Sequence, residues 1–282
     1  MNINRTPFTH LSALGEINGD IHHAVDPVER RGRIVFAHGY KGFKDWGAWD
    51  LLGDTLAEEG WDFVRFNFSH NGHIKPNLLD CSDETAWSHN TYSMELSDLE
   101  SVLEFARDGM LTDSEQLIVM GHSRGGGIAS LAASRTDVDG LVLLASVCDF
   151  ESRFPSGEAL NKWRSSDRLE VLNGRTMQVL SHSFTFYEDF IENSESLNIE
   201  SAIRSLTKPL LVIHGDSDEA VDISDGEKLA GWANDGKLIV IPGAAHTFGA
   251  SHPWDSADLP PHTTDVVHAV KQFLAKILVG HT

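Results

Sequence analysis

The sequence predicts an α/β protein built on a mainly parallel sheet that carries helices on both faces. Short apolar runs alternate with longer helical patterns along most of the 282 residues, and this alternation is typical of βα units. The hydrophobic share of 41% and the charged share of 23% are those of an ordinary globular chain. The length is sufficient to bury the core that such a sheet needs.

The chain begins with a predicted hairpin, because apolar runs at residues 11–17 and 21–25 flank Asn18-Gly19-Asp20. An Asn-Gly pair favours a tight turn between antiparallel strands. Six further apolar runs predict strands at residues 34–37, 63–68, 117–120, 141–145, 210–214 and 238–241. Helical patterns predict helices at residues 49–59, 92–107, 126–134, 224–233 and 264–278. In the last of these the apolar residues recur at helical spacing, so it is expected to pack on the sheet.

One segment, at about residues 149–205, interrupts this strand and helix order. Within it, residues 168–180 read as a hairpin about Asn173-Gly174. Apolar and aromatic residues then crowd together as Phe184, Phe186, Tyr187, Phe190 and Ile191. We interpret the segment as an insertion lying over the strand ends. Its aromatic residues either pack the insertion onto the core or line a pocket, and both roles stay open.

Composition excludes several classes of partner. The chain has 22 basic and 42 acidic residues, a net charge of −20, which repels nucleic acid. No apolar stretch approaches the roughly 20 residues of a membrane span, and the first residues lack a signal peptide core. We therefore expect a cytoplasmic protein without a membrane partner. The two cysteines, Cys81 and Cys148, show no metal-ligand spacing.

A serine between two glycines is the most informative motif. Gly121-His122-Ser123-Arg124-Gly125 follows the apolar run at residues 117–120 and precedes a predicted helix. A tight strand-to-helix turn needs small flanking residues and leaves the serine hydroxyl projecting above the sheet, which is the geometry of a nucleophile elbow. The alternative is a glycine-rich turn that merely begins a helix.

A serine nucleophile needs an imidazole to accept its proton and a carboxylate to orient that imidazole. Asp216 and Asp218 follow the predicted strand at 210–214, and His246 follows the last predicted strand. Both places are carboxyl ends of strands, where open α/β sheets gather their sites. Asp216 and Asp149 remain alternatives to Asp218 as the acid, and the other histidines are expected to be structural or exposed.

Backbone amides are also needed, to stabilise the negative oxygen that forms during acyl transfer. One is expected from Arg124, the residue after the serine, and a second from Tyr40 in the loop after the strand at 34–37. Such a donor contributes about 3 to 4 kcal/mol to transition-state stabilisation. Neither side chain is needed for this role.

Four motifs in order resemble the α/β-hydrolase superfamily: His38-Gly39-Tyr40, Gly121-His122-Ser123-Arg124-Gly125-Gly126, His214-Gly215-Asp216-Ser217-Asp218 with Val221, and Gly243-Ala244-Ala245-His246. The chain is most similar to small bacterial serine esterases of the cinnamoyl and feruloyl esterase and dienelactone-hydrolase-like group. The resemblance runs from about Ile34 to the C-terminus. It implies the α/β-hydrolase fold in a single domain over residues 1–282, with the insertion at about 149–205 as a cap.

The same resemblance implies the site and its chemistry. Ser123 is expected to be the nucleophile, His246 the base and Asp218 the orienting acid, with the amides of Tyr40 and Arg124 as the oxyanion hole. The expected reaction is hydrolysis of a small-molecule carboxylic ester without a metal or organic cofactor. The alternatives are an amidase or peptidase with the same triad and a catalytically silent binding protein. Aromatic residues of the insertion, with Trp46 and Trp87, suggest an apolar or aromatic acyl group.

Overall fold

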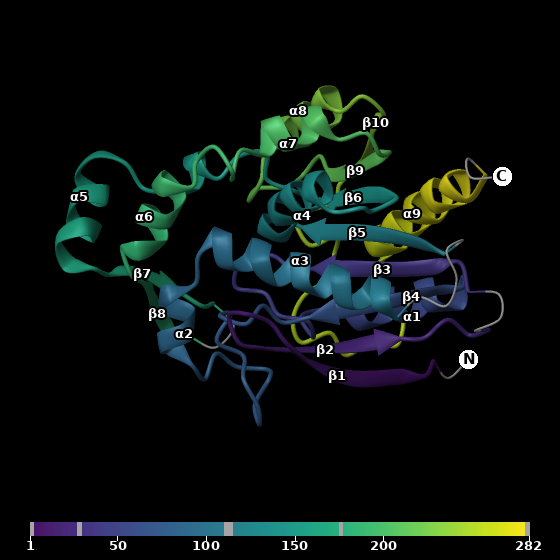
Figure 1. Ribbon diagram of the computed structural model, residues 1–282, viewed down its shortest axis with the longest axis horizontal. Helices are drawn as coiled ribbons and strands as arrows, with labels where there is room; N and C mark the ends of the chain where they lie inside the picture. The colour runs from purple at the N-terminus through teal and green to yellow at the C-terminus, as the bar shows by residue number, and fades with distance from the viewer. Residues whose placement is uncertain (1–2, 27–29, 110–114, 175–176, 280–282) are drawn as a thin grey trace.

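The computed structural model describes residues 3–26, 30–109, 115–174 and 177–279, and its core is an eight-stranded sheet (Figure 1). The strand order is β1-β2-β4-β3-β5-β6-β9-β10. β1 and β2 are antiparallel, β2 is antiparallel to β4, and the remaining neighbours are parallel. The strands are β1 Arg5–Leu11, β2 Glu16–His22, β3 Gly32–Ala37, β4 Trp61–Phe66, β5 Gln116–His122, β6 Gly140–Leu144, β9 Leu210–Gly215 and β10 Gly236–Ile241. The predicted mainly parallel sheet is confirmed.

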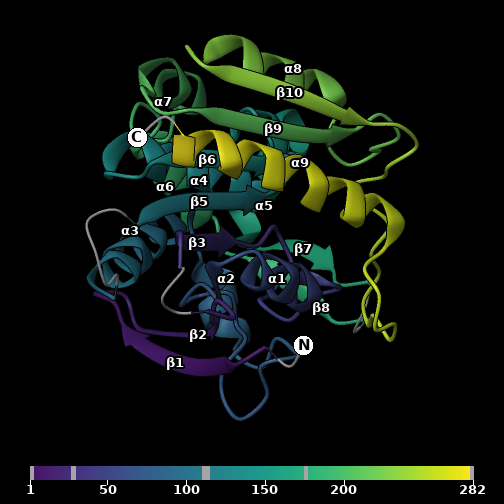
Figure 2. The same cartoon turned by 90° about the vertical axis from the view of Figure 1, so that its right-hand side faces the viewer.

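Helices cover both faces of this sheet, as the sequence predicts (Figure 2). Along β3, Ile34 and Phe36 belong to one hydrophobic cluster and Val35 and Ala37 to the other, because alternate strand residues point to opposite faces. The first cluster includes residues of α1 Trp49–Glu58 and α9 Pro261–Val279. The second includes residues of α3 Tyr92–Asp108, α4 Arg124–Arg135, α7 Ile199–Ser205 and α8 Ile223–Trp232. Of the described helices, none is both long and apolar enough to cross a bilayer.

The N-terminal hairpin exists, but its strands are β1 and β2, so both the predicted strands at 11–17 and 21–25 and the predicted turn are wrong. The turn lies at residues 12–15, where the Ser12 amide donates to the Gly15 carbonyl at 2.9 Å. Asn18 and Gly19 are inside β2, with Gly19 paired to Phe8 of β1. A Cβ at Gly19 would lie 2.3 Å from the Phe8 ring. This glycine therefore permits close packing of an aromatic ring and does not make a turn.

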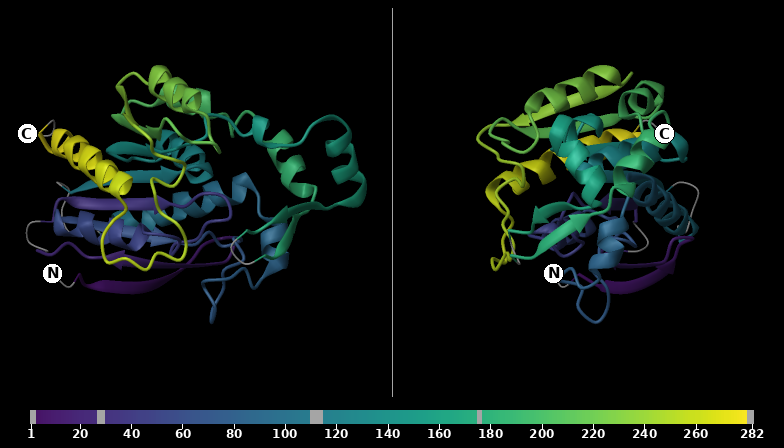
Figure 3. Two further views of the ribbon diagram at one scale, coloured as in Figure 1. Left: turned by 180° about the vertical axis from the view of Figure 1, so that it is seen from behind. Right: turned by 90° about the vertical axis from the view of Figure 1, so that its left-hand side faces the viewer.

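The segment at 149–205 leaves the sheet and returns to it. It contains the short 3-10 helix Glu151–Arg153, α5 Gly157–Ser166, β7 Leu169–Leu172, β8 Val179–His182, α6 Thr185–Glu192 and α7. The predicted hairpin is confirmed, since β7 and β8 are antiparallel and the Asn173 amide donates to the Gln178 carbonyl at 2.8 Å. α5, α6 and the hairpin extend beyond one end of the sheet, whereas α7 packs on α4 (Figures 1 and 3). α2 Glu84–His89 lies against β8.

Candidate active site

Ser123 occupies a strained turn between β5 and α4. Its φ of 55° and ψ of −121° are unusual for a residue with a side chain. A Cβ at Gly121 would lie 2.3 Å from the Gly125 carbonyl oxygen, and a Cβ at Gly125 would lie 2.3 Å from that of His38. The turn can form only because both flanking residues are glycine, and it leaves the serine at the carboxyl end of β5.

Asp218 and His246 come from the loops after β9 and β10 and meet in space. His246 Nδ1 lies 2.8 Å from Asp218 Oδ2. The other carboxylate oxygen accepts the amides of Ala220 at 2.8 Å and Val221 at 3.0 Å. Because a carboxylate only accepts, Nδ1 carries the hydrogen and Nε2 is left as the basic nitrogen.

The Asp218 side chain is fully buried, yet its surroundings favour the charged form. Burial opposes ionisation, but hydrogen bonds from His214, His246 and the Val221 amide outweigh it and hold the pKa of Asp218 well below its usual range. His214 Nε2 lies 3.4 Å from Asp218 Oδ2 and donates to the Val221 carbonyl at 2.9 Å. His214 is buried at the strand end, as expected, and in addition orients the acid.

The two alternative acids make other contacts. Asp216 Oδ1 accepts the Gly243 amide at 2.6 Å, which ties the β9 loop to the β10 loop. Asp149 accepts the amide and the hydroxyl of Ser152. In the described part of the chain neither carboxylate has a hydrogen bond or ion pair with His246.

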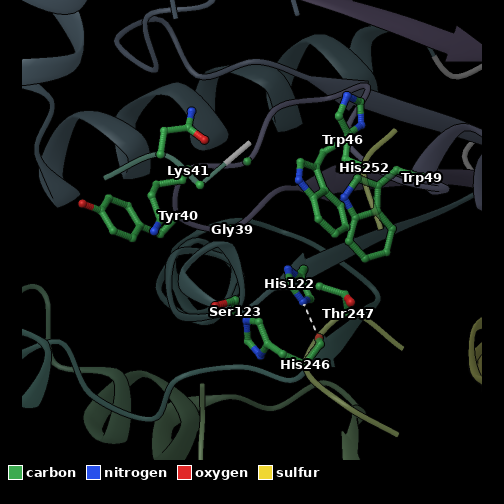
Figure 4. A pocket seen from close by; sticks show the side chains of 13 residues that line it. Gly39, Tyr40, Lys41, Trp46, Trp49, His122, Ser123, His246, Thr247 and His252 are labelled. Atoms are coloured by element: carbon green, nitrogen blue, oxygen red, sulfur yellow. Dashed lines mark hydrogen bonds between the residues drawn. The ribbon is translucent and has the colours of Figure 1, made fainter. Parts of the chain in front are cut away.

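The His246 ring lies next to the Ser123 side chain, and both residues line the same two cavities (Figure 4). Among the described residues the Ser123 hydroxyl makes no hydrogen bond. Catalytic hydrogen bonds are often long before substrate binds and tighten in the complex. The geometry therefore brings hydroxyl, imidazole and carboxylate together in the predicted order.

The amides of Tyr40 and Arg124 have no acceptor within the described chain. Arg124 is the first residue of α4, whose amide has no partner inside the helix. The loop carrying Tyr40 comes close to Ser123, since a Cβ at Gly39 would lie 3.0 Å from the Ser123 Cβ. Both amides are therefore available to an oxyanion beside Ser123.

The side chains of Tyr40 and Arg124 also make contacts that no sequence motif predicts. The Tyr40 hydroxyl lies 2.9 Å from Nε2 of His182 in β8. Burial raises the pKa of Tyr40 to about 12, so the phenol keeps its proton. The Arg124 guanidinium lies 4.0 Å from the Tyr40 ring centroid and donates to Glu95 at 3.2 Å. Residues far apart in sequence thus meet around the loop that carries Tyr40.

Ser123 lies where two cavities meet. The first, about 440 Å³, is the tryptophan cavity, and its lining includes Trp46, Trp49 and His252. The second, about 450 Å³, is the arginine cavity. Its lining includes Tyr92, Arg124, Phe150, Arg153, Phe154, Leu169, His182 and Phe186. Trp46 thus lines a cavity, whereas Trp87 stacks on His182 at 4.0 Å and is absent from both described linings.

Comparison with known proteins decides the family. A model described as the alpha/beta hydrolase family matches residues 34–258. The chain belongs to the alpha/beta hydrolase family. The predicted α/β-hydrolase fold is confirmed with it.

Solved structures resemble this alpha/beta hydrolase over nearly its whole length. Est1E from Butyrivibrio proteoclasticus superposes with a TM-score of 0.69 at 19% identity, covering 97% of this chain and 99% of that chain. Est1E with ferulic acid bound gives 0.68 at 21%, covering 94% and 96%. Dienelactone hydrolase from Anabaena variabilis gives 0.65 at 15%, covering 98% and 99%. At these identities the likeness establishes the fold.

Sequence reasoning missed a role for His122 in this alpha/beta hydrolase. His122 Nε2 donates to the His246 carbonyl at 2.9 Å, and the two rings lie 4.7 Å apart. Burial lowers the pKa of His122 to about 3, so it holds the His246 loop as a neutral donor. Its position directly before Ser123 was the available signal.

The other candidate chemistries find little support in the described residues. They contain no group of three or more histidines, cysteines or acids that could hold a metal ion. Cys81 and Cys148 are buried, and burial raises the pKa of each thiol to about 12. A buried thiol with a raised pKa is a poor nucleophile.

Proposed function

We propose that this alpha/beta hydrolase is a serine esterase that cleaves carboxylic esters of small molecules. The observation that carries the proposal is the hydrogen bond between Asp218 and His246 beside a strained serine where two cavities meet. Two cavities suit a substrate with two sizeable halves, one on each side of the bond that is cleaved.

In the proposed reaction His246 Nε2 takes the Ser123 proton as Oγ attacks the ester carbonyl carbon. The carbonyl oxygen becomes negative and accepts hydrogen bonds from the amides of Tyr40 and Arg124. The C–O bond to the alcohol then breaks, and His246 returns the proton to the departing alcohol. Water attacks the acyl-enzyme with the same base, and the carboxylic acid leaves Ser123 free.

We also propose that the inserted segment, residues 149–205, acts as a cap over this site in a single-domain protein. Phe150, Phe154, Leu169 and Phe186 of the segment line the arginine cavity, which supports this role. The hydrogen bond between Tyr40 and His182 connects the segment to the loop after β3 that carries Tyr40, here called the oxyanion loop. The cap would therefore bound the substrate while the sheet supplies the reacting groups. The cytoplasmic location expected from the sequence stays a prediction.

The test is a screen of short aliphatic and aryl esters with the wild-type protein, Ser123→Ala and Ser217→Ala. Ser217 is an exposed serine in the β9 loop and serves as the matched control. We expect ester hydrolysis by the wild type and the control, and loss of at least 10³-fold in Ser123→Ala. Full activity of Ser123→Ala would contradict the proposal, and faster cleavage of peptide amides than of esters would favour an amidase.

A further inference from the structure

The charged side chains that line the arginine cavity are opposite in sign to the net charge of the protein. The chain carries a net charge of −20. Lys41, Arg124 and Arg153 nevertheless line this cavity, and its described lining includes no aspartate or glutamate. A nearby surface cavity shows the contrast, because its lining includes four acids, at positions 149, 151, 195 and 200. The positive lining is therefore local to the site and favours an anionic ligand.

Arg124 is the most deeply placed of these cations. Its side chain is 11% exposed, against 32% for Arg153. In the described chain its guanidinium makes one hydrogen bond, to Glu95 at 3.2 Å, and its remaining donors have no protein acceptor. Glu95 is absent from the described lining, whereas Arg124 belongs to it.

Glu95 is the acid that pairs with the Arg124 guanidinium in the described chain. Glu95 is buried, and burial raises its pKa above the usual range despite the guanidinium beside it. Its second oxygen has no hydrogen-bond partner among the described residues. A buried guanidinium with free donors is well suited to a carboxylate, which it can bind through two parallel hydrogen bonds.

Aromatic rings form much of the remaining lining. The guanidinium lies 4.0 Å from the Tyr40 ring centroid, 5.0 Å from that of Tyr92 and 5.2 Å from that of Phe186. Phe150 and Phe154 also line the cavity. These contacts hold Arg124 in place beside a cavity of about 450 Å³ whose lining is rich in aromatic rings.

We propose that the arginine cavity binds a carboxylate-bearing, aromatic half of the substrate, with Arg124 pairing with that carboxylate while Ser123 attacks the ester carbonyl. The inference rests on the proposed esterase function. It makes the Arg124 side chain a specificity determinant, in addition to the oxyanion role of its amide. Arg153, which forms an ion pair with Asp225 at 2.8 Å, also lines the cavity. It is more exposed than Arg124 and contributes a second positive charge.

The test compares isosteric esters that differ only in charge. One pair is 4-nitrophenyl 4-carboxybenzoate and its 4-carbamoyl analogue, and the other is 3-carboxyphenyl acetate and its 3-carbamoyl analogue. We expect the wild type to prefer the carboxylate in at least one pair by about 10- to 100-fold in kcat/KM, the usual range for a charged hydrogen bond. The preference should fall as salt rises.

The preference should disappear in Arg124→Met and fall less in Arg153→Met. For each variant, the ratio of the kcat/KM values of the two esters cancels any change in the oxyanion hole that affects both esters equally. Because Arg124→Met leaves Glu95 unpaired, the double variant Arg124→Met/Glu95→Gln provides a second chain without the buried charge. Arg204→Met is the matched control, since Arg204 is exposed and pairs with Glu200 away from the cavity. It should keep the preference.

A binding measurement separates this inference from the proposed function. Calorimetry with Ser123→Ala should show that terephthalate binds at least 10-fold more tightly than terephthalamide, without any turnover. Wild-type turnover that is equal or faster with both carbamoyl esters would overturn the inference and leave the esterase proposal intact. A preference that survives in both Arg124 variants would overturn it too. Absence of ester turnover together with selective terephthalate binding would instead contradict the proposed function alone.

Discussion

The carboxyl ends of the sheet strands and the inserted segment, residues 149–205, meet at Ser123. They contribute different kinds of residue to the candidate site. At the carboxyl ends of the strands, short backbone turns position the candidate catalytic side chains. One example is the loop in which the Ala220 and Val221 amides donate to Asp218. The inserted segment contributes side chains from residues far away in sequence, such as His182 and Phe186. The positions of Ser123, Asp218 and His246 therefore depend on local turns, whereas the shape of the arginine cavity depends on long-range packing.

The largest expected loss of activity comes from a substitution at the carboxyl ends of the strands. Asp218→Asn should lower kcat by about 10³- to 10⁴-fold, because an amide in place of the carboxylate no longer fixes the His246 tautomer or stabilises its charged form. Steady-state kinetics on one ester measures this. Asp216→Asn is the matched control in the same loop, since Asp216 bonds the Gly243 amide instead. Equal losses of kcat in both variants would contradict the role of Asp218 in orienting His246.

Stability against acid should also depend mainly on the sheet region. Burial lowers the pKa of His22 and His38 to about 4 and that of His122 to about 3. The unfolded chain, with a histidine pKa near 6.5, binds more protons over this window, so stability is lost as pH falls from about 6.5 toward 4. Each such histidine should cost about 2 kcal/mol between pH 7.5 and 5.

Urea unfolding at the two pH values measures that loss. His182 in the inserted segment, whose pKa burial lowers to about 3, adds one further contribution of the same sign. His182→Phe should therefore make the pH dependence only slightly shallower. A free energy of unfolding that is flat between pH 7.5 and 5 would contradict the neutral buried state of these histidines.

A smaller effect is expected where the oxyanion loop passes Ser123. Gly39→Ala would place a methyl group 3.0 Å from the Ser123 Cβ and 3.1 Å from the His122 ring, so the loop must shift. We expect kcat to fall by about 10- to 100-fold with little change in KM. Gly231→Ala is the control, because a Cβ there meets nothing within 4 Å. Similar kinetics for the two variants would argue against a tight oxyanion loop.

The smallest effect should come from the contact between the two regions. Tyr40→Phe keeps the amide and the ring but removes the bond to His182, so KM should rise about 2- to 5-fold and the unfolding free energy should fall by about 1 kcal/mol. Tyr187→Phe is the control, as the Tyr187 hydroxyl makes no hydrogen bond among the described residues. A loss of 100-fold in kcat would show that the inserted segment acts in the chemistry itself.

The same division explains what the sequence could predict. The parallel strands and the helices α1, α3, α4, α8 and α9 follow from local patterns, whereas α2, α5, α6 and α7 were not predicted. The order of Ser123, Asp218 and His246 follows as well, since each of these residues comes soon after a strand. The Asn18-Gly19 turn was wrong because the sequence alone cannot show that Phe8 packs against Gly19. The position of Trp87 outside the cavities likewise depends on its stacking with His182.

The partners of the Arg124 side chain were out of reach for the same reason. Glu95 precedes Arg124 by 29 positions, and Tyr40 and His182 are 142 positions apart. No local period or motif links such residues. Only tertiary packing brings Tyr40, Arg124 and His182 to the arginine cavity and places Glu95 beside Arg124.

The central claim is that Ser123 is a nucleophile activated by His246. Mass spectrometry after treatment with a fluorophosphonate probe tests it most directly, using the wild type, Ser123→Ala and His246→Ala. The account predicts one adduct per chain on the wild-type peptide that contains Ser123, no adduct on that peptide in Ser123→Ala, and labelling slowed by at least 10²-fold in His246→Ala. A folded wild-type protein that stays unlabelled at Ser123, or labels there equally fast without His246, would contradict the account.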